Sequence, residues 1–170
     1  MHKSIIHACL VGAVAVTGVA HAELQSKEFQ IKLHADVPVV GGFDVKPVGW
    51  SLSDEQVIVW DAEGKKFTPL TLTVNLKSGV GGVHVKFANA DVQKLSHATQ
   101  EDAYYALSAK VGDKDVGTDK VSVLTKDEAK DGKDVALVIT PDNASEKIAN
   151  APLEGKYTGT LQLVFESNVD

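Results

Sequence analysis

The chain has 170 residues and a formal net charge of −6, and its charged side chains make up 24% of the total. All 17 basic residues are lysines, because the sequence contains no arginine. A negative charge without a basic cluster argues against a nucleic-acid partner. The lack of guanidinium groups disfavours bidentate recognition of phosphate or carboxylate.

Residues 1–22 have the three parts of a secretory signal peptide. A basic start at Met1-His2-Lys3 is followed by a short apolar run and by the small-x-small ending Ala20-His21-Ala22. The run is too short and too rich in Gly and Ala for a membrane-spanning helix, which needs about 20 apolar residues. The single cysteine, Cys9, lies inside this segment. We therefore predict an exported protein whose mature chain folds as one domain without a disulfide.

Within residues 28–40, apolar and polar side chains alternate strictly over the nine residues from Phe29 to Val37. This period of two predicts a strand with one apolar face, which must lie in a groove. The groove belongs either to the same domain or to another molecule, and the pattern alone leaves both alternatives open. The apolar positions are Phe29, Ile31, Leu33, Ala35 and Val37.

Short alternating or apolar runs recur through the rest of the chain and predict about eight strands, hence an all-β antiparallel sandwich. The Gly-rich segment 77–82 predicts the turn of a hairpin between two of them. Single helical turns are expected only at 91–95, 101–105 and 145–149. The predicted strands cover 57–60, 67–76, 83–87, 105–111, 121–123, 135–139 and 156–166.

The sequence shows no catalytic constellation. No serine stands in a Gly-x-Ser-x-Gly frame, and no Gly-rich loop leads into a Lys-Ser or Lys-Thr pair. His34, His84 and His97 are spread along the chain without the convergent spacing that metal ligands need. We predict no enzymatic activity, no metal site and no cofactor.

Three blocks of the chain resemble pilins of the chaperone–usher class. The closest likeness is to the Cys-free major subunits of colonisation-factor fimbriae, which the alternate chaperone pathway of Gram-negative bacteria assembles. The blocks are the alternating leader at 31–38, the middle run at 67–88 and the Gly-x-Tyr-x-Gly-x-apolar terminus at 155–165.

The resemblance implies an immunoglobulin-like fold that lacks its last strand and is completed by a donor strand. It divides the chain into a signal peptide (1–22), a donor-strand extension (23–38) and an Ig-like pilin domain (39–170). The donor residues would be the five apolar positions from Phe29 to Val37. The C-terminal strand beside the receiving groove would present Tyr157, Gly159, Leu161, Leu163 and Phe165.

The same resemblance implies a structural subunit of a bacterial surface fimbria that serves adhesion to host tissue. Its partners would be identical subunits, a periplasmic chaperone and an outer-membrane usher, together with a tip adhesin and a host receptor. The chain would pass through the periplasm to the cell surface. The alternative function is a secreted monomeric β-sandwich that binds carbohydrate or protein. Deletion of residues 23–37 would unfold such a module, whereas a pilin would lose only its ability to join subunits.

Overall fold

The computed structural model describes residues 42–91 and 93–169, which form twelve β-strands and one short helix. The predicted signal peptide, the extension 23–38 and the five predicted donor residues lie outside the described residues. No helix in the described ranges is long and apolar enough to cross a membrane.

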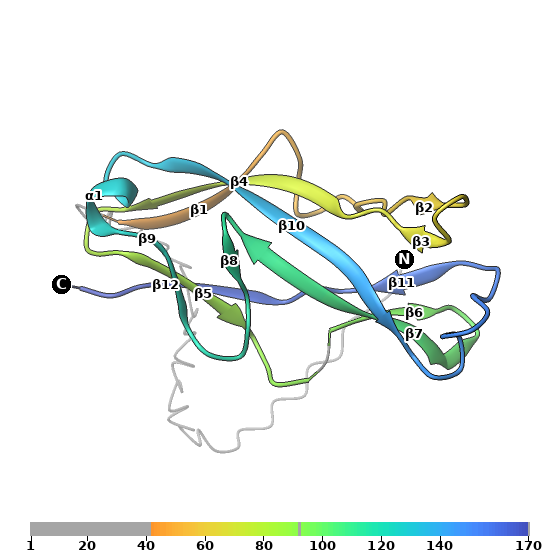
Figure 1. Ribbon diagram of the computed structural model, residues 1–170. Coiled ribbons are helices and arrows are strands. Elements are labelled where there is room, and N and C mark those ends of the chain that lie inside the picture. The colour runs from red at the N-terminus through yellow and green to blue at the C-terminus, as the bar shows by residue number, and fades with distance from the viewer. Residues whose placement is uncertain (1–41, 92, 170) are drawn as a thin grey trace, which may run out of the picture. The chain divides into compact units, whose positions relative to one another are not determined.

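The larger sheet is antiparallel, and its strands follow the order β1-β4-β10-β7-β6-β11, with β8 attached to β7 (Figure 1). Its central strands β4, β7 and β10 are the longest in the structure, so most of the backbone pairing in this sheet involves them. The strands are β1 (Phe43–Val48), β4 (Leu70–Ser78), β6 (Lys94–His97), β7 (Gln100–Val111), β8 (Lys114–Asp115), β10 (Lys133–Ala144) and β11 (Tyr157–Gly159).

A second sheet of three antiparallel strands has the order β12-β5-β9. A separate hairpin of two short strands, β2 and β3, precedes β4, and the helix α1 follows β9. The strands of the second sheet are β5 (Val83–Phe87), β9 (Val121–Leu124) and β12 (Leu163–Ser167). The hairpin is β2 (Trp60–Asp61) with β3 (Lys66–Phe67), and α1 covers Lys126–Ala129.

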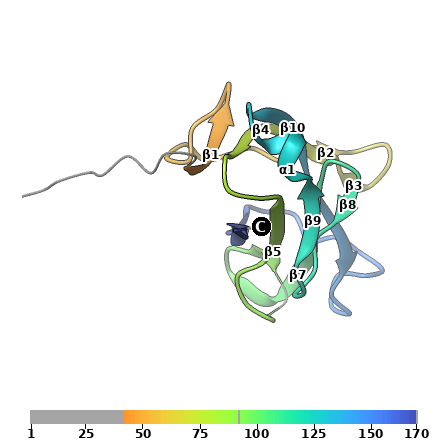
Figure 2. The same cartoon turned by 90° about the vertical axis from the view of Figure 1, so that its left-hand side faces the viewer.

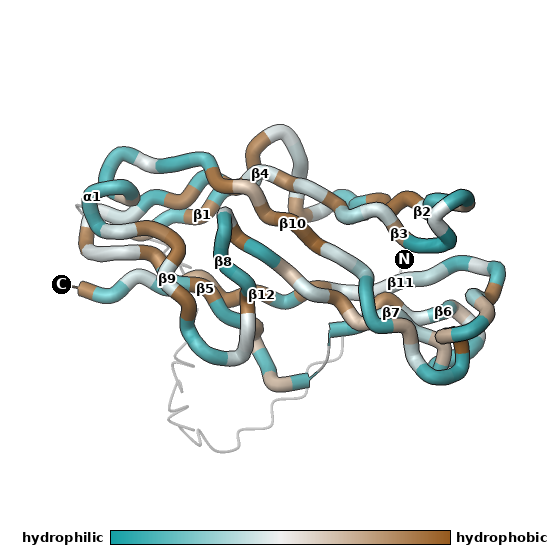
Figure 3. The backbone as a smooth tube through the Cα atoms, in the orientation of Figure 1, coloured by the Kyte–Doolittle hydropathy of each residue, from teal (hydrophilic) through white to brown (hydrophobic). Residues whose placement is uncertain are grey.

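The hydrophobic core lies between the two sheets and is built from alternate residues of each strand, as the period of two requires. Figure 3 shows these apolar residues as brown segments along β10 and β12, on opposite sides of the core. The all-β prediction is therefore correct. Fully buried side chains include Leu76 on β4, Val83 and Val85 on β5, and Val111 on β7.

The predicted hairpin around residues 77–82 is wrong. Its two strands, β4 and β5, belong to different sheets, so the Gly-rich segment carries the chain across the core. Gly82 is needed there because a Cβ atom would lie only 2.9 Å from the carbonyl oxygen of Leu124. Gly82 therefore permits close passage of the backbone, and the segment does not form a tight hairpin turn.

Two of the three predicted helical turns are wrong, since 101–105 lies in β7 and Leu95 lies in β6. Residues 145–149 do form a single turn, in which the Ile148 N–H donates to the Ser145 carbonyl at 3.0 Å. The helix that does form, α1, begins with a capping box. The Thr125 side chain accepts a hydrogen bond from the Glu128 backbone, and the Glu128 carboxylate accepts one from the Thr125 backbone. The Thr-x-x-Glu spacing that encodes this motif was visible in the sequence.

Candidate functional site

Strand β1 is an edge of the larger sheet, and strand β12 is an edge of the second sheet. Strand β1 pairs only with β4, and β12 pairs only with β5, among the residues that the structure describes. Seen from the end that carries α1, β1 stands above the C-terminal strand (Figure 2). Each edge strand therefore presents a row of backbone N–H and C=O groups without a ladder partner, which is a template for a further strand.

An apolar groove with a cavity volume of about 1130 Å³ lies between these two edges. Its floor consists of inward-facing leucine and isoleucine side chains from the larger sheet, and its walls come from β1 and from the C-terminal strands. The groove is thus a part of the hydrophobic core that the two sheets leave uncovered. The floor residues include Leu72, Leu95, Leu107, Leu137 and Ile139, and the walls include Val45, Pro47, Leu161, Leu163 and Phe165.

All five residues predicted for the C-terminal groove strand line this groove, at Tyr157, Gly159, Leu161, Leu163 and Phe165. Sequence alternation predicted one continuous strand, but the segment is divided into β11 and β12. Strand β11 pairs with β6 of the larger sheet, whereas β12 pairs with β5 of the second sheet. The wall of the groove therefore changes sheets half-way along its length. Its role in receiving a strand stays a prediction.

The change of sheets is fixed by a buried glutamine. Gln93 is 8% exposed, and its side-chain amide donates to Asn89 Oδ1 and to the Asp91 carbonyl, each at 2.9 Å. Its side-chain oxygen accepts the backbone N–H of Gln162 at 3.3 Å. The Gln162 carbonyl in turn accepts the N–H of Ala88 at 3.0 Å. These bonds satisfy the backbone at the point where the strand leaves one ladder for the other.

The rim of the groove beyond β1 includes residues 57–59, which belong to the strand that we predicted at 57–60. They lie outside any ladder, and the side chains of Val57 and Val59 are 74% and 59% exposed. The chain is anchored on either side of this rim. The Trp50 indole N–H donates to the Thr73 carbonyl at 2.7 Å, and the Thr68 N–H donates to the Val59 carbonyl at 2.8 Å.

At its Tyr157 end, the groove continues into a second cavity of about 620 Å³, which we call the end hollow. Four residues line both spaces: Trp60, Phe67, Gly155 and Tyr157. The hollow is also lined by Lys65, Tyr105 and residues 150–154. Its lining thus includes residues of the β2–β3 hairpin and of β11.

The aromatic rings of the end hollow form an edge-to-face cluster around Phe67. Its ring centroid lies 5.0 Å from that of Trp60, 5.1 Å from Tyr105 and 5.8 Å from Tyr157, with interplanar angles of 74–89°. Such contacts stabilise by about 0.5–1.5 kcal/mol each beyond area burial. Burial raises the pKa of the Tyr105 hydroxyl, and a smaller contribution comes from Tyr157. The floor of the hollow is therefore a packed aromatic cluster.

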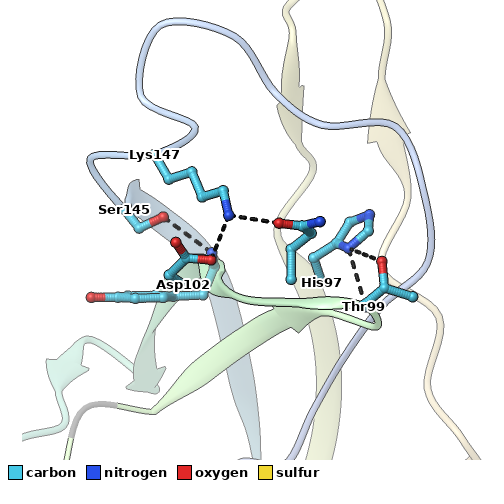
Figure 4. A network of polar contacts seen from close by, with 7 residues as sticks. His97, Thr99, Asp102, Ser145 and Lys147 are labelled. Atoms are coloured by element: carbon cyan, nitrogen blue, oxygen red, sulfur yellow. Dashed lines mark hydrogen bonds and ion pairs between the residues drawn. The ribbon is translucent and has the colours of Figure 1, made fainter.

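A polar network holds the loop that forms one side of the end hollow (Figure 4). Lys147 Nζ donates to Asp102 Oδ1 at 2.7 Å and to Gln100 Oε1 at 2.6 Å. Hydrogen bonding to the Lys147 ammonium lowers the pKa of Asp102 below its usual value. Nearby, His97 Nε2 lies 3.0 Å from the Glu154 carbonyl oxygen. These bonds tie the loop 145–154 to the β6–β7 hairpin.

On the second sheet, a carboxylate of β12 is held between two lysines. Glu166 pairs with Lys120 and, at 3.1 Å, with Lys86. Hydrogen bonds from Lys120 and then Lys86 lower the pKa of the Glu166 carboxyl. The pairing fastens β12 to β5 and to the segment before β9. Among the described residues, no group of three His, Cys, Asp or Glu side chains converges as a metal site would require.

Comparison with known proteins identifies the family of the chain that forms this groove. The profile of the CS1 type fimbrial major subunits matches residues 27–166. The chain belongs to this family. A search of curated proteins gave no match.

Among solved structures, the chain is similar to the CooA pilin subunit from enterotoxigenic Escherichia coli, with a TM-score of 0.56 and 16% sequence identity. The likeness covers 74% of this chain and 88% of that chain. At this identity the similarity establishes the fold, which is that of a pilin.

Family and fold together confirm the predicted resemblance and the predicted fold class. The fimbrial subunit is a structural component of a surface pilus, and like subunits polymerise to form it. They also decide between the two functions that the sequence left open, in favour of the fimbrial subunit over the monomeric binding module.

Proposed function

We propose that the fimbrial subunits are joined by donor-strand exchange, in which residues 23–38 of one subunit lie in the groove of the next. The observation that carries this proposal is the open apolar groove between the unpaired edges of β1 and β12. An added strand completes both ladders with main-chain hydrogen bonds, and alternate side chains fill the pockets between the sheets. The alternation at Phe29–Val37 meets that requirement.

The energy available to such a joint is large. Burial of Phe29, Ile31, Leu33 and Val37 at roughly 1.5–3 kcal/mol each stabilises the contact by about 6–12 kcal/mol before ordering costs. Nine residues of extended chain span about 30 Å, which suits a strand lying along β11 and β12. The mature chain has no cysteine once Cys9 is removed with the signal peptide, so the joint between subunits would be non-covalent.

The same groove determines what the subunit needs on its route to the cell surface. An exposed hydrophobic groove promotes aggregation, so each subunit needs a periplasmic chaperone to cover it until an outer-membrane usher passes the subunit into the fibre. In this role the fibre carries out adhesion to host tissue, either directly or through a tip adhesin.

The experiment is a gel of fimbriae before and after boiling, for two variants of the leader. Leu33→Asp places a charge on the apolar face of the donor strand, and we expect it to abolish the ladder of unboiled multimers while the folded subunit is still exported. Lys32→Asp changes a neighbouring residue on the polar face and should leave the ladder intact. A normal ladder from Leu33→Asp subunits contradicts the proposal.

A further inference from the structure

The end hollow adjoins the groove at its Tyr157 end. It is continuous with the groove through Trp60, Phe67, Gly155 and Tyr157. Its outer lip is apolar, because the side chains of Trp60 and Leu153 are each 37% exposed. The inference below rests on the proposed donor-strand exchange and concerns what occupies this hollow.

The direction of the donor strand decides which part of it reaches the hollow. Each subunit's leader enters its own domain at Phe43, which pairs with Ser78. The Ser78 hydroxyl is hydrogen bonded to that of Ser167, so the leader emerges beside the end of β12. A donor strand parallel to β12 would bring the neighbouring domain to this same end, where the acceptor's own leader emerges.

An antiparallel donor strand avoids that conflict. Its last residues then leave the groove at the Tyr157 end, opposite the point where the acceptor's own leader emerges. This head-to-tail arrangement leaves every leader free to reach a further subunit, as an open filament requires. Such a strand pairs antiparallel with β12 and parallel with β1, because β1 begins at the Ser78–Ser167 contact whereas β12 ends there.

The residues that follow Val37 are Pro38-Val39-Val40-Gly41-Gly42. Pro38 has no backbone N–H, so strand pairing weakens there and the chain is free to leave the sheet edge. Val39 and Val40 come next and are apolar, and two glycines separate them from Phe43. From Val37 to Phe43 the chain spans at most about 20 Å. The two valines are therefore held close to the end hollow.

We propose that Val39 and Val40 of each subunit fill the end hollow of the next subunit. The contact buries two β-branched side chains against the aromatic floor and covers the lip formed by Trp60 and Leu153. The donor segment then extends beyond Pro38, and the end hollow becomes the joint that sets how neighbouring domains meet.

Two synthetic peptides separate this inference from the proposed function. A peptide of residues 28–37 fills only the groove, whereas a peptide of residues 28–40 also reaches the hollow. Both are titrated against purified Leu33→Asp subunits, which are unable to donate their own leader. We expect the longer peptide to bind at least tenfold more tightly, because burial of two valines exceeds the entropy lost in ordering them.

Two controls localise the effect. A 28–40 peptide with Val39→Ser and Val40→Ser should bind like the shorter peptide. Leu153→Ser alters a residue that lines the hollow and not the groove, so it should weaken the long peptide and leave the short one unchanged. Trp60 fluorescence, read in a Trp50→Phe background, should respond more strongly to the longer peptide. Equal affinity of the 28–37 and 28–40 peptides overturns the inference alone, whereas failure of both to bind overturns donor-strand exchange as well.

Discussion

The hydroxyl oxygens of Ser78 and Ser167 lie 2.6 Å apart and connect the end of β4 in the larger sheet with the end of β12 in the second sheet. Ser78 is fully buried, and its hydroxyl also accepts the backbone N–H groups of Val80 at 3.3 Å and Gly81 at 3.2 Å. One side chain therefore joins the two sheets at the end where the leader emerges, and satisfies the backbone of the crossing segment.

Replacement of this hydroxyl should weaken the fold. We expect Ser78→Ala to lower the free energy of unfolding by about 1–3 kcal/mol, because buried N–H groups lose their acceptor. Urea unfolding of the purified subunit measures the change. Ser122→Ala, on an exposed position of β9, is the matched control and should change stability by less than about 0.5 kcal/mol. Equal effects of the two substitutions would mean that the Ser78 hydroxyl does not join the sheets.

Gly159 should not tolerate a side chain. A Cβ atom at this position would collide with the Lys94 carbonyl oxygen on β6, the strand with which β11 pairs. We expect Gly159→Ala to destabilise the subunit by about 1–3 kcal/mol through displacement of the groove wall. Gly117→Ala is the control, because its nearest neighbour would be the Asp119 nitrogen at 3.9 Å. Urea unfolding compares the two, and a Gly159→Ala subunit as stable as Gly117→Ala contradicts the described approach of β11 to β6.

Acid should weaken the cap of α1. Hydrogen bonds from Lys133 and then Thr125 lower the pKa of Glu128 from an ordinary 4.5 to about 2. Because the folded-state pKa is the lower one, this carboxylate stabilises the fold fully above about pH 4.5, and its contribution disappears as the pH falls through about 2. Glu128→Gln should therefore show a smaller loss of stability than the wild type over this range.

The measurement is the urea midpoint at several pH values between 6 and 2, with Glu63→Gln in the β2–β3 turn as the control. The control should keep the pH dependence of the wild type. If the wild type and Glu128→Gln lose stability in parallel, the ionised capping box does not contribute to the fold.

The strands with regular alternation could be predicted from the sequence because one face of each is buried. This holds for β4, β7 and β9, and for the C-terminal residues that line the groove. The period of two indicates which face of a strand is buried, but it does not indicate which other strand pairs with it. The sequence therefore placed β4 and β5 in one hairpin, although they belong to opposite sheets.

Other errors arose where local rules are overridden by contacts distant in sequence. Strand β10 was expected to end before Pro141, yet it continues to Ala144 in register with β7, with a bulge between Asp142 and Ala144. The break at 160–162 depends on the buried Gln93, 69 residues away from Gln162. The end hollow was missed because its rings come from β2, β3, β7 and β11, and their convergence is a property of the fold.

The most direct measurement mixes two defective subunits that carry different affinity tags. Leu33→Asp subunits should receive a donor strand but not provide one, whereas Leu163→Asp subunits should provide one but have a damaged groove. Expressed together, they should form a two-subunit complex that contains both tags. The complex should stay intact during electrophoresis of unboiled samples, and no larger multimers should form. The absence of this mixed pair, or ladders formed by either variant alone, would contradict the account in which each leader fills the groove of a neighbouring subunit.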